Sequence, residues 1–307
     1  KVTTIFDMAI NSILEISRGS KAHGSCGMGI NETVTRDEAG FLLRVSDVGL
    51  ISLEHIVRQI KNEWVPKRLA QLHLTRENTG PEAQRYFDIL ESSQPETVAH
   101  DLRVLTLKNL QIAAHFRARA NETVIYEGAQ GLMLDEFLGT FPHVTRSITG
   151  LASAVKAAAE LGLKEIQPVY MTRCYSTRHG NGPLLLEGVP FSSNMNIIDK
   201  TNVTNQWQGT IRYAPLNLAA LISIINSDYE RAEAVAQLYR IRILLPKIGV
   251  TCLDQVGDWI QTVDGTQMNV EDAAKEIATR VLGYPEALAF ESWGPTRNDV
   301  QQTRSGV

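Results

Sequence analysis

The chain has 307 residues, of which 43% are apolar and 21% are charged, with a formal net charge of −4. This length is sufficient to bury a hydrophobic core, and the acidic balance excludes a general nucleic-acid binder, which needs clustered Lys and Arg. Because the three cysteines form no disulfide or metal-ligand spacing, and no apolar run reaches membrane-spanning length, we expect a cytoplasmic protein without membrane segments or metal ligands of its own.

Helices dominate the first part of the chain. Apolar residues at helical spacing predict an amphipathic helix over residues 3–18, which a Gly-rich stretch over 19–31 ends. Further helices are predicted over residues 49–72 and 98–118. Pro81 and Pro95 mark breaks in the stretch between these two helices.

Strands and helices alternate in the second part of the chain. A buried strand is predicted over residues 123–127, further strands over 166–172 and 247–254, and helices over 148–162, 216–226 and 270–283. This alternation predicts an α/β fold with a mainly parallel sheet. Ligands of such sheets bind beyond the carboxyl ends of the strands. We therefore expect Gln130, residues 175–182 and Asp254, which follow the three strands, to form one composite site.

Two Gly-rich segments are candidates for ligand contacts. Residues 24–29 (Gly-Ser-Cys-Gly-Met-Gly) are able to bring backbone N–H groups close to an anion, or they connect two helices flexibly; no Gly-Lys-Ser/Thr follows, so they are not a Walker A motif. Residues 127–131 (Glu-Gly-Ala-Gln-Gly) present the amide of Gln130 to a base or a phosphoryl oxygen, or they form a tight turn with a solvated Gln.

Three polar segments follow. Residues 175–183 are either a substrate lip or a polar loop, and His179 has no catalytic partner nearby in the sequence. Residues 201–213 collect amides, hydroxyls, one Arg and two aromatic rings, which suits a small carboxylate or a sugar, or they form an exposed loop. Asp254 either accepts hydrogen bonds from a guanine edge or caps a helix. Together with Ser292-Trp293-Gly294-Pro295, it forms the last of the candidate segments along the chain.

In this order, the five segments resemble the adenylosuccinate synthetase family. The most specific matches are residues 18–22, 127–135, 139–145 and 175–183. The resemblance implies a P-loop-NTPase-like fold, with a mainly parallel central sheet flanked by helices, and a single domain over residues 1–307 that lacks the N-terminal segment of the family. It also implies a homodimer.

The family reaction joins L-aspartate to C6 of the purine of IMP, with Mg²⁺ and with GTP as co-substrate, through a 6-phosphoryl intermediate. By resemblance, Gln130 contacts the purine 6-oxygen, and the acid and base residues are expected upstream of this chain. The purine monophosphate is expected at Ser25, Cys26, Gln130, Leu134, Thr145 and His179. The amino acid is expected at Asn202, Val203, Thr204, Asn205 and Arg212, and GTP at Cys252, Asp254, Ser292 and Gly294.

The chain also departs from the family pattern. Trp207, Gln208 and Gly209 stand where the family has arginines, which leaves Arg212 as the nearby guanidinium. Cys26 replaces a phosphate-binding Thr, and Cys252 replaces a Lys beside Asp254. Gly40 stands where a neighbouring subunit of the family donates a phosphate-binding Arg, and Arg36 is the nearest replacement.

Several functions therefore stay open. The chain belongs either to an IMP ligase, to a phage-type ligase that forms 2-aminoadenylosuccinate from dGMP, or to a nucleotide-binding pseudoenzyme. GTP or ATP serves as the triphosphate, and the lost arginines leave room for an amino acid other than aspartate. If the chain is complete as it stands, we expect no ligase activity.

Overall fold

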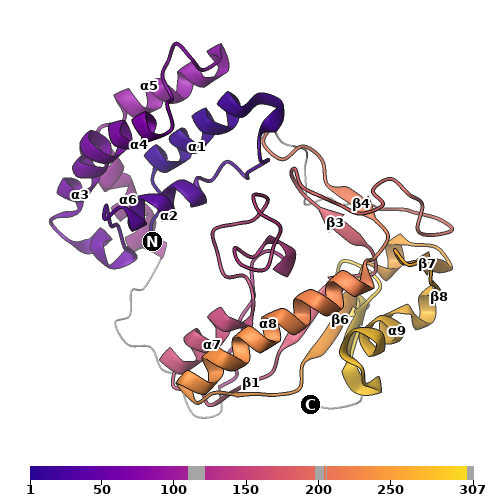
Figure 1. The fold of residues 1–307 in the computed structure, drawn as a ribbon. Coiled ribbons are helices and arrows are strands. Elements are labelled where there is room, and N and C mark those ends of the chain that lie inside the picture. The colour runs from indigo at the N-terminus through magenta and orange to yellow at the C-terminus, as the bar shows by residue number, and fades with distance from the viewer. Residues whose placement is uncertain (110–121, 198–203, 205, 303–307) are drawn as a thin grey trace. The chain divides into compact units, whose positions relative to one another are not determined.

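The computed structural model describes residues 1–307 except 110–121, 198–203, 205 and 303–307. It separates into two compact units, Lys1–Phe116 with Asn205–Gly209 and Arg117–Thr204 with Thr210–Val307 (Figure 1). Segment 205–209 therefore belongs to the first unit, although the residues on either side of it belong to the second. The prediction of a single domain over 1–307 stays a prediction.

The described part of the first unit is helical. Thr4 begins its first helix with a capping box, in which Thr4 Oγ1 and the Asp7 carboxylate each accept the backbone N–H of the other residue. A hydrophobic core gathers around Phe6, Ile10 and Trp64. The helices are α1 (Ile5–Arg18), α2 (Ile30–Glu38), α3 (Leu53–Gln59), α4 (Val65–Gln71), α5 (Gln84–Ser92) and α6 (Pro95–Asn109).

Between α3 and α4 the backbone continues as a π-helical turn over Ile60–Trp64. Pro66, in the first turn of α4, has no N–H to donate. The loss of that donor explains why the regular α-helical hydrogen bonding is interrupted just before it.

The second unit is built on a four-stranded sheet with the order β10-β9-β6-β2. The strands β2 (Val169–Arg173), β6 (Lys247–Thr251) and β9 (Leu288–Ser292) run parallel, and β10 (Val300–Gln302) is antiparallel to β9. Ile248 and Val250 of β6 are fully buried in one core cluster with Ile277 of α9 (Val270–Leu282). The helix α7 (Leu151–Glu160) packs along α8 (Leu218–Tyr239), the long helix in Figure 1.

The described residues of the second unit also form three two-stranded sheets. β1 (Glu165–Ile166) pairs with β5 (Arg242–Ile243), β3 (Ser176–Arg178) with β4 (Arg212–Ala214), and β7 (Trp259–Gln261) with β8 (Gln267–Asn269). In the described part of the chain, no helix is both long and apolar enough to cross a membrane.

Most of the predicted elements are confirmed. The α/β class, the parallel sheet, the helices over 3–18, 49–72, 148–162 and 270–283, and the strands over 166–172 and 247–254 are all present, with shifts of a few residues at their ends. The helix predicted over 216–226 is longer than expected and continues to Tyr239. The helix predicted over 98–118 is confirmed up to Asn109, beyond which it lies outside the described residues.

Some predictions were wrong. Residues 123–127 form no strand, and Ile125 is 87% exposed rather than buried. Their β-branched side chains favour extended backbone, but a strand also needs a hydrogen-bonding partner, and no described strand pairs with them. Pro95 does mark a boundary as expected: α5 ends at Ser92, and Pro95 begins α6, where its missing N–H costs nothing. The sequence reading also missed α2 and α5.

Candidate functional site

The Gly-rich loop, residues 24–29, is held by α1 of the same unit. The Glu15 carboxylate, which is 4% exposed, accepts the backbone N–H groups of Gly24 and Ser25 at 3.0 and 3.3 Å and also binds Arg18. Asn11 Nδ2 donates to the Ser25 hydroxyl at 3.0 Å. The start of the loop therefore already holds an internal anion, which satisfies N–H groups that a phosphate would otherwise bind.

This arrangement distinguishes the two loop residues predicted to bind phosphate. The Ser25 hydroxyl is half-buried and also accepts the N–H of Gly27 at 3.3 Å, so it helps to shape the loop. Cys26 is an exposed free cysteine. Of the two side chains, only that of Cys26 is directed to solvent, and the assignment of both to a phosphate stays a prediction.

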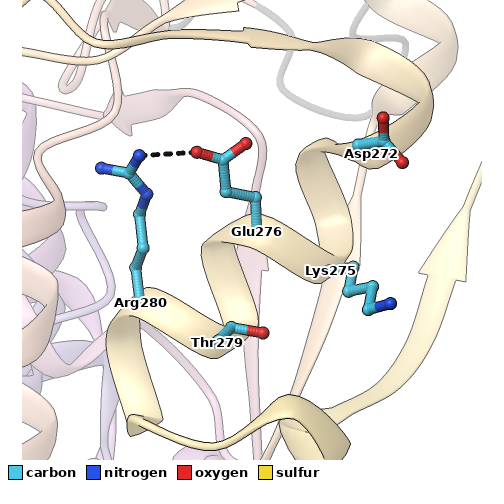
Figure 2. Close-up of a pocket in the computed structure, with 5 residues that line it drawn as sticks. All are labelled: Asp272, Lys275, Glu276, Thr279 and Arg280. Atoms are coloured by element: carbon cyan, nitrogen blue, oxygen red, sulfur yellow. Dashed lines mark hydrogen bonds and ion pairs between the residues drawn. The ribbon is translucent and has the colours of Figure 1, made fainter.

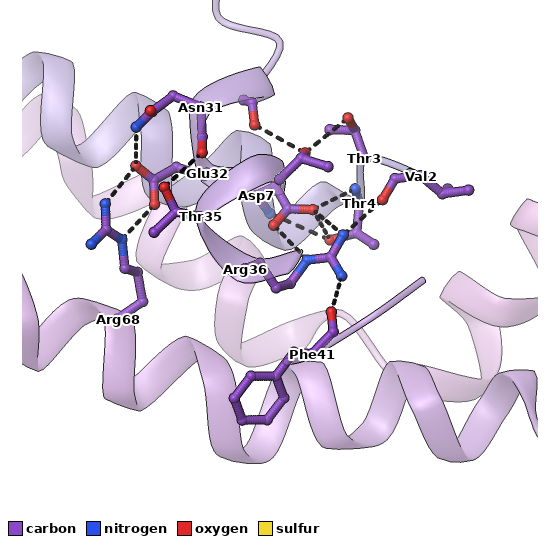
Figure 3. A network of polar contacts seen from close by, with 12 residues as sticks. Val2, Thr3, Thr4, Asp7, Asn31, Glu32, Thr35, Arg36, Phe41 and Arg68 are labelled. Carbon is purple, nitrogen blue, oxygen red and sulfur yellow. Dashed lines mark hydrogen bonds and ion pairs between the residues drawn. The ribbon is translucent and has the colours of Figure 1, made fainter. Parts of the chain in front are cut away.

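Arg36 is not placed to replace a phosphate-binding arginine, so that expectation was wrong. Its side chain is 1% exposed and pairs with the fully buried Asp7, with Nε 2.9 Å from Oδ1 (Figure 3). Its remaining donors bind the carbonyl oxygens of Phe41 and Val2 at 2.6 and 2.7 Å. The guanidinium is thus committed to the interior of the first unit, because Asp7 would otherwise be a buried unpaired charge.

In the second unit, the segment that follows Gln130 is organised by Asp135. This carboxylate is fully buried and accepts the backbone N–H groups of Phe137 and Thr149 at 2.9 and 2.7 Å. Arg231 of α8 lies 3.3 Å from it. A backbone hydrogen bond of 2.8 Å from Thr145 N–H to the carbonyl of Leu134 brings these two predicted purine-site residues together. Asp135 ends one of the segments that resemble the family, but the sequence alone indicates no role for it.

Gln130 itself is exposed and has a φ of +74°. A non-glycine residue in the left-handed region costs about 1–2 kcal/mol, and such conformations gather at ligand-binding positions. Gln130 does not follow a strand as predicted, because residues 123–127 form none.

Residues 175–183 include the strand β3, which pairs antiparallel with the distant strand β4. Arg178 in β3 stands directly opposite Arg212 in β4. Burial, together with the charge of Arg212, lowers the pKa of Arg178, whose guanidinium donates to the His143 carbonyl at 2.9 Å. Arg212 is held by Glu187 at 2.7 Å and by the carbonyl oxygens of Gly180 and Gly182. His179 is half-buried at the end of β3.

The predicted GTP residues follow two neighbouring parallel strands. Cys252 and Asp254 come after β6, and Ser292 ends β9, its partner in the sheet. Asp254 is exposed in a 3₁₀ turn, and Cys252 has a φ of +65°. Ser292 Oγ donates to the carbonyl of Gly294 at 2.9 Å. The structure thus confirms that the loops at Asp254 and at residues 175–182 follow adjacent strand ends, since β2 also pairs with β6.

Of the predicted amino-acid loop, Asn202, Val203 and Asn205 lie outside the described residues, and Thr204 is exposed. Trp207, at a position where an arginine was expected, packs on Gly27 and Tyr86 of the first unit. The predicted site residues are therefore divided, with Ser25 and Cys26 in the first unit and the other described ones in the second.

Two surface hollows contain none of the predicted site residues. One, of about 370 Å³, lies on α9 beside Glu276 and Arg280 (Figure 2), and the other, of about 400 Å³, lies beside Gly40 and Phe41. Among the described residues, no three His, Cys, Asp or Glu side chains are grouped to hold a metal ion.

Comparison with known proteins gives consistent matches. The family model described as adenylosuccinate synthetase matches residues 1–202. The adenylosuccinate synthetase of Malacoplasma penetrans is 28% identical over 185 residues, which are 59% of this chain and 40% of that protein. That of Clostridium beijerinckii is 30% identical over 188 residues, with the same coverage. The matched region thus spans about 40% of the length of these curated relatives.

A solved structure supports the fold. The fully ligated adenylosuccinate synthetase of Plasmodium falciparum matches 97% of this chain and 75% of its own, with a TM-score of 0.58 and 15% sequence identity. At this identity the likeness concerns the fold alone.

Proposed function

The chain belongs to the adenylosuccinate synthetase family, since the family model covers residues 1–202 of its 307, and we propose that it forms part of a purine-nucleotide ligase. The proposed reaction joins L-aspartate to C6 of the purine of IMP and hydrolyses GTP through a 6-phosphoryl intermediate. Conversion of the purine 6-oxygen into a phosphate makes it a better leaving group for the aspartate amine. In such phosphoryl transfers the protein mainly positions the groups and stabilises charge. We further propose a cytoplasmic homodimer.

The observation that most supports the proposal is the position of Gln130. It stands in the most specific matching segment, is exposed, and is held at a φ of +74° that glycine would adopt without strain. Its side-chain amide offers one acceptor and two donors, which suits a purine 6-oxygen that gains a phosphoryl group. We propose that Gln130 positions this oxygen and takes no part in proton transfer.

We assign the rest of the purine site to residues of the other segments that resemble the family. Leu134 and Thr145, joined by their backbone hydrogen bond, face the purine and its 5′-phosphate, and His179 borders the ribose. Ser25 and Cys26 contribute from the Gly-rich loop, with Ser25 shaping the backbone.

For the triphosphate we propose the carboxyl ends of β6 and β9. The exposed Asp254 carboxylate is able to accept two hydrogen bonds from N1–H and N2–H₂ of guanine, an edge that adenine lacks. Cys252, Ser292 and Gly294 would border the same base. Mg²⁺ would accompany the triphosphate and neutralise its charge. We propose no protein ligand for the ion, since among the described residues no three His, Cys, Asp or Glu side chains are grouped.

The test uses the full-length protein with GTP, Mg²⁺, aspartate and a panel of purine monophosphates that includes IMP and dGMP. We expect phosphate release that depends on both IMP and aspartate. Preference for dGMP would instead identify the ligase that forms 2-aminoadenylosuccinate, and no release with any purine would refute the ligase. Asp254→Asn should raise the KM for GTP more than that for IMP.

One observation favours a second function, a nucleotide-binding protein without turnover. Arg212, the guanidinium expected to meet the amino-acid carboxylate, already binds Glu187 and two backbone carbonyl groups. Calorimetric binding of IMP or GTP by a full-length protein that releases no phosphate would support this function over the ligase.

A further inference from the structure

In the first unit, the indole of Trp207 lies where a side chain of residue 27 would otherwise lie. A Cβ atom added to Gly27 would stand 2.7 Å from Nε1 and 2.8 Å from Cδ1 of the Trp207 indole. These separations are well inside van der Waals contact, so the ring fills the space that any side chain at position 27 would need. Gly27 also has a φ of +77°, a second and independent reason for glycine there.

α5 holds the segment that carries Trp207. The ring of Tyr86 lies 6.1 Å from the indole, centroid to centroid, at an interplanar angle of 52°. The guanidinium of Arg85 lies 4.7 Å over the Tyr86 ring, and its Nη2 donates to Gln206 Oε1 at 3.3 Å. Tilted ring pairs and cation–π contacts of this kind are both attractive, so they stabilise the position of the segment that carries Trp207.

The Gly-rich loop is thereby fixed at three points. Glu15 and Asn11 of α1 hold Gly24 and Ser25, and Trp207 lies against Gly27. Gly29 packs against the backbone of α1, where an added Cβ would stand 2.7 Å from the carbonyl carbon of Asp7. Between these points, Cys26 and Met28 are exposed.

We propose that Trp207 is a positioning residue of the substrate site. It holds the Gly-rich loop in one conformation, so that the backbone around Cys26 is ordered before the 5′-phosphate of the purine nucleotide binds. The identity of this ligand rests on the proposed function, whereas the restraint of the loop by Trp207 rests only on the contacts described above. A segment of the expected amino-acid loop would thus support the nucleotide site by aromatic packing, where the arginines of the family pattern are missing.

Amide hydrogen exchange of the full chain tests the hold on the loop without any ligand. The N–H groups of Gly24, Ser25 and Gly27 all have hydrogen-bond partners, so their exchange reports loop opening. In Trp207→Ala we expect exchange about two- to tenfold faster, the change that corresponds to one aromatic contact, and in Trp207→Phe a value near wild type. Trp259→Ala, in the second unit, should leave these amides unchanged.

A pair of glycine variants separates contact with the indole from backbone strain. Gly27 and Gly40 both have positive φ, +77° and +90°, but an added Cβ at Gly40 meets no atom within 4 Å. Gly27→Ala should therefore accelerate exchange of the loop amides, whereas Gly40→Ala should not. Gly27→Ala should accelerate exchange less in the Trp207→Ala background than in wild type, because the indole that clashes is gone and only the strain of the positive φ remains. An equal acceleration by Gly27→Ala in both backgrounds would overturn the contact.

Calorimetry with IMP then tests the role in binding. We expect Trp207→Ala to weaken IMP binding by about two- to tenfold, with recovery in Trp207→Phe, and in an active full-length protein to raise the KM for IMP while kcat is retained. Unchanged exchange of residues 24–29 in Trp207→Ala, or faster exchange with unchanged IMP affinity, would overturn the proposal. If wild type binds no purine monophosphate, the proposed function fails and Trp207 has no role in positioning this substrate, whatever the exchange data show for the loop.

Discussion

The carboxylate of Asp228, in α8, accepts the backbone N–H of Leu151, the first residue of α7, at 3.1 and 3.2 Å. The same carboxylate accepts the hydroxyl of Tyr170 from β2 at 2.9 Å. One side chain that is 1% exposed therefore joins two helices and a strand of the second unit. The contact also explains why residue 150 is glycine, because an added Cβ there would overlap the Asp228 carboxylate.

Asp228→Ala should destabilise the protein by about 2–4 kcal/mol, because it leaves two buried donors without an acceptor. The measurement is urea unfolding of the full chain. Gly150→Ala should also destabilise wild type, and its cost should fall in the Asp228→Ala background, since the atoms it would strike are gone. Additive costs of the two substitutions would contradict this direct contact.

The same carboxylate predicts a pH dependence of stability. Burial raises the pKa of Asp228, against the hydrogen bonds from Leu151 and Tyr170. A carboxyl whose pKa is higher in the folded state binds its proton more tightly there. Its contribution to the free energy of unfolding is therefore greatest below the unfolded value of about 3.9 and falls as the pH rises through the interval up to the folded pKa.

Asp228→Asn serves as the reference, because its carboxamide does not titrate in this pH range. The difference in unfolding free energy, wild type minus Asp228→Asn, should therefore decrease as the pH rises from about 3.9, and should then become constant once wild type is ionised. Urea unfolding of both proteins at a series of pH values measures it. A difference that increases with pH would mean that the folded pKa is lowered instead.

The buried pair of Arg36 and Asp7 predicts a large effect of a single substitution. Arg36→Ala leaves the Asp7 carboxylate buried without its partner, which costs about 3–5 kcal/mol. Arg58, which pairs with Glu54 in an exposed position, offers a matched control. Arg58→Ala should change the urea midpoint far less, because water screens that pair. If the two variants unfold alike, Arg36 is not committed to the core as the structure has it.

How far the sequence predicted this structure depended on whether a property was local. The strands over 166–172 and 247–254 were predictable because their apolar and β-branched residues favour extended backbone. Residues 123–127 are also rich in β-branched residues, but a strand depends on a distant partner that no local pattern shows. Glu15 resembles an ordinary polar residue of the helix predicted over 3–18, and Arg36 was expected near a phosphate. Only the fold reveals that Arg36 is buried in an ion pair and that the Glu15 carboxylate binds the Gly-rich loop. Gln130 was predicted as a site residue, but its positive φ was not.

The three cysteines should differ in reactivity, because they differ in burial. Cys174 is 1% exposed, burial raises its thiol pKa, and its Sγ donates to the Cys252 carbonyl at 3.3 Å. Cys26, by contrast, is exposed. Because the thiolate is the reactive form, N-ethylmaleimide should label Cys26 first and Cys174 last in the native protein. Peptide mass spectrometry over time measures the order, and labelling of all three thiols in urea is the control.

Gln130 offers a prediction in which stability and binding change in opposite directions. Gln130→Gly removes the cost of a left-handed non-glycine residue, so it should raise the free energy of unfolding by about 1 kcal/mol. The same substitution removes the amide proposed to meet the purine 6-oxygen, so IMP affinity should fall. Gln130→Ala keeps the strain of the positive φ and should lose IMP affinity without gaining stability.

Arg240→Gly is the matched control. Arg240 is exposed and has a φ of +56° at the end of α8, so this variant should gain stability while its IMP binding stays unchanged. If Gln130→Gly binds IMP as wild type does, the side chain does not contact the purine, and the strain at this position needs another explanation.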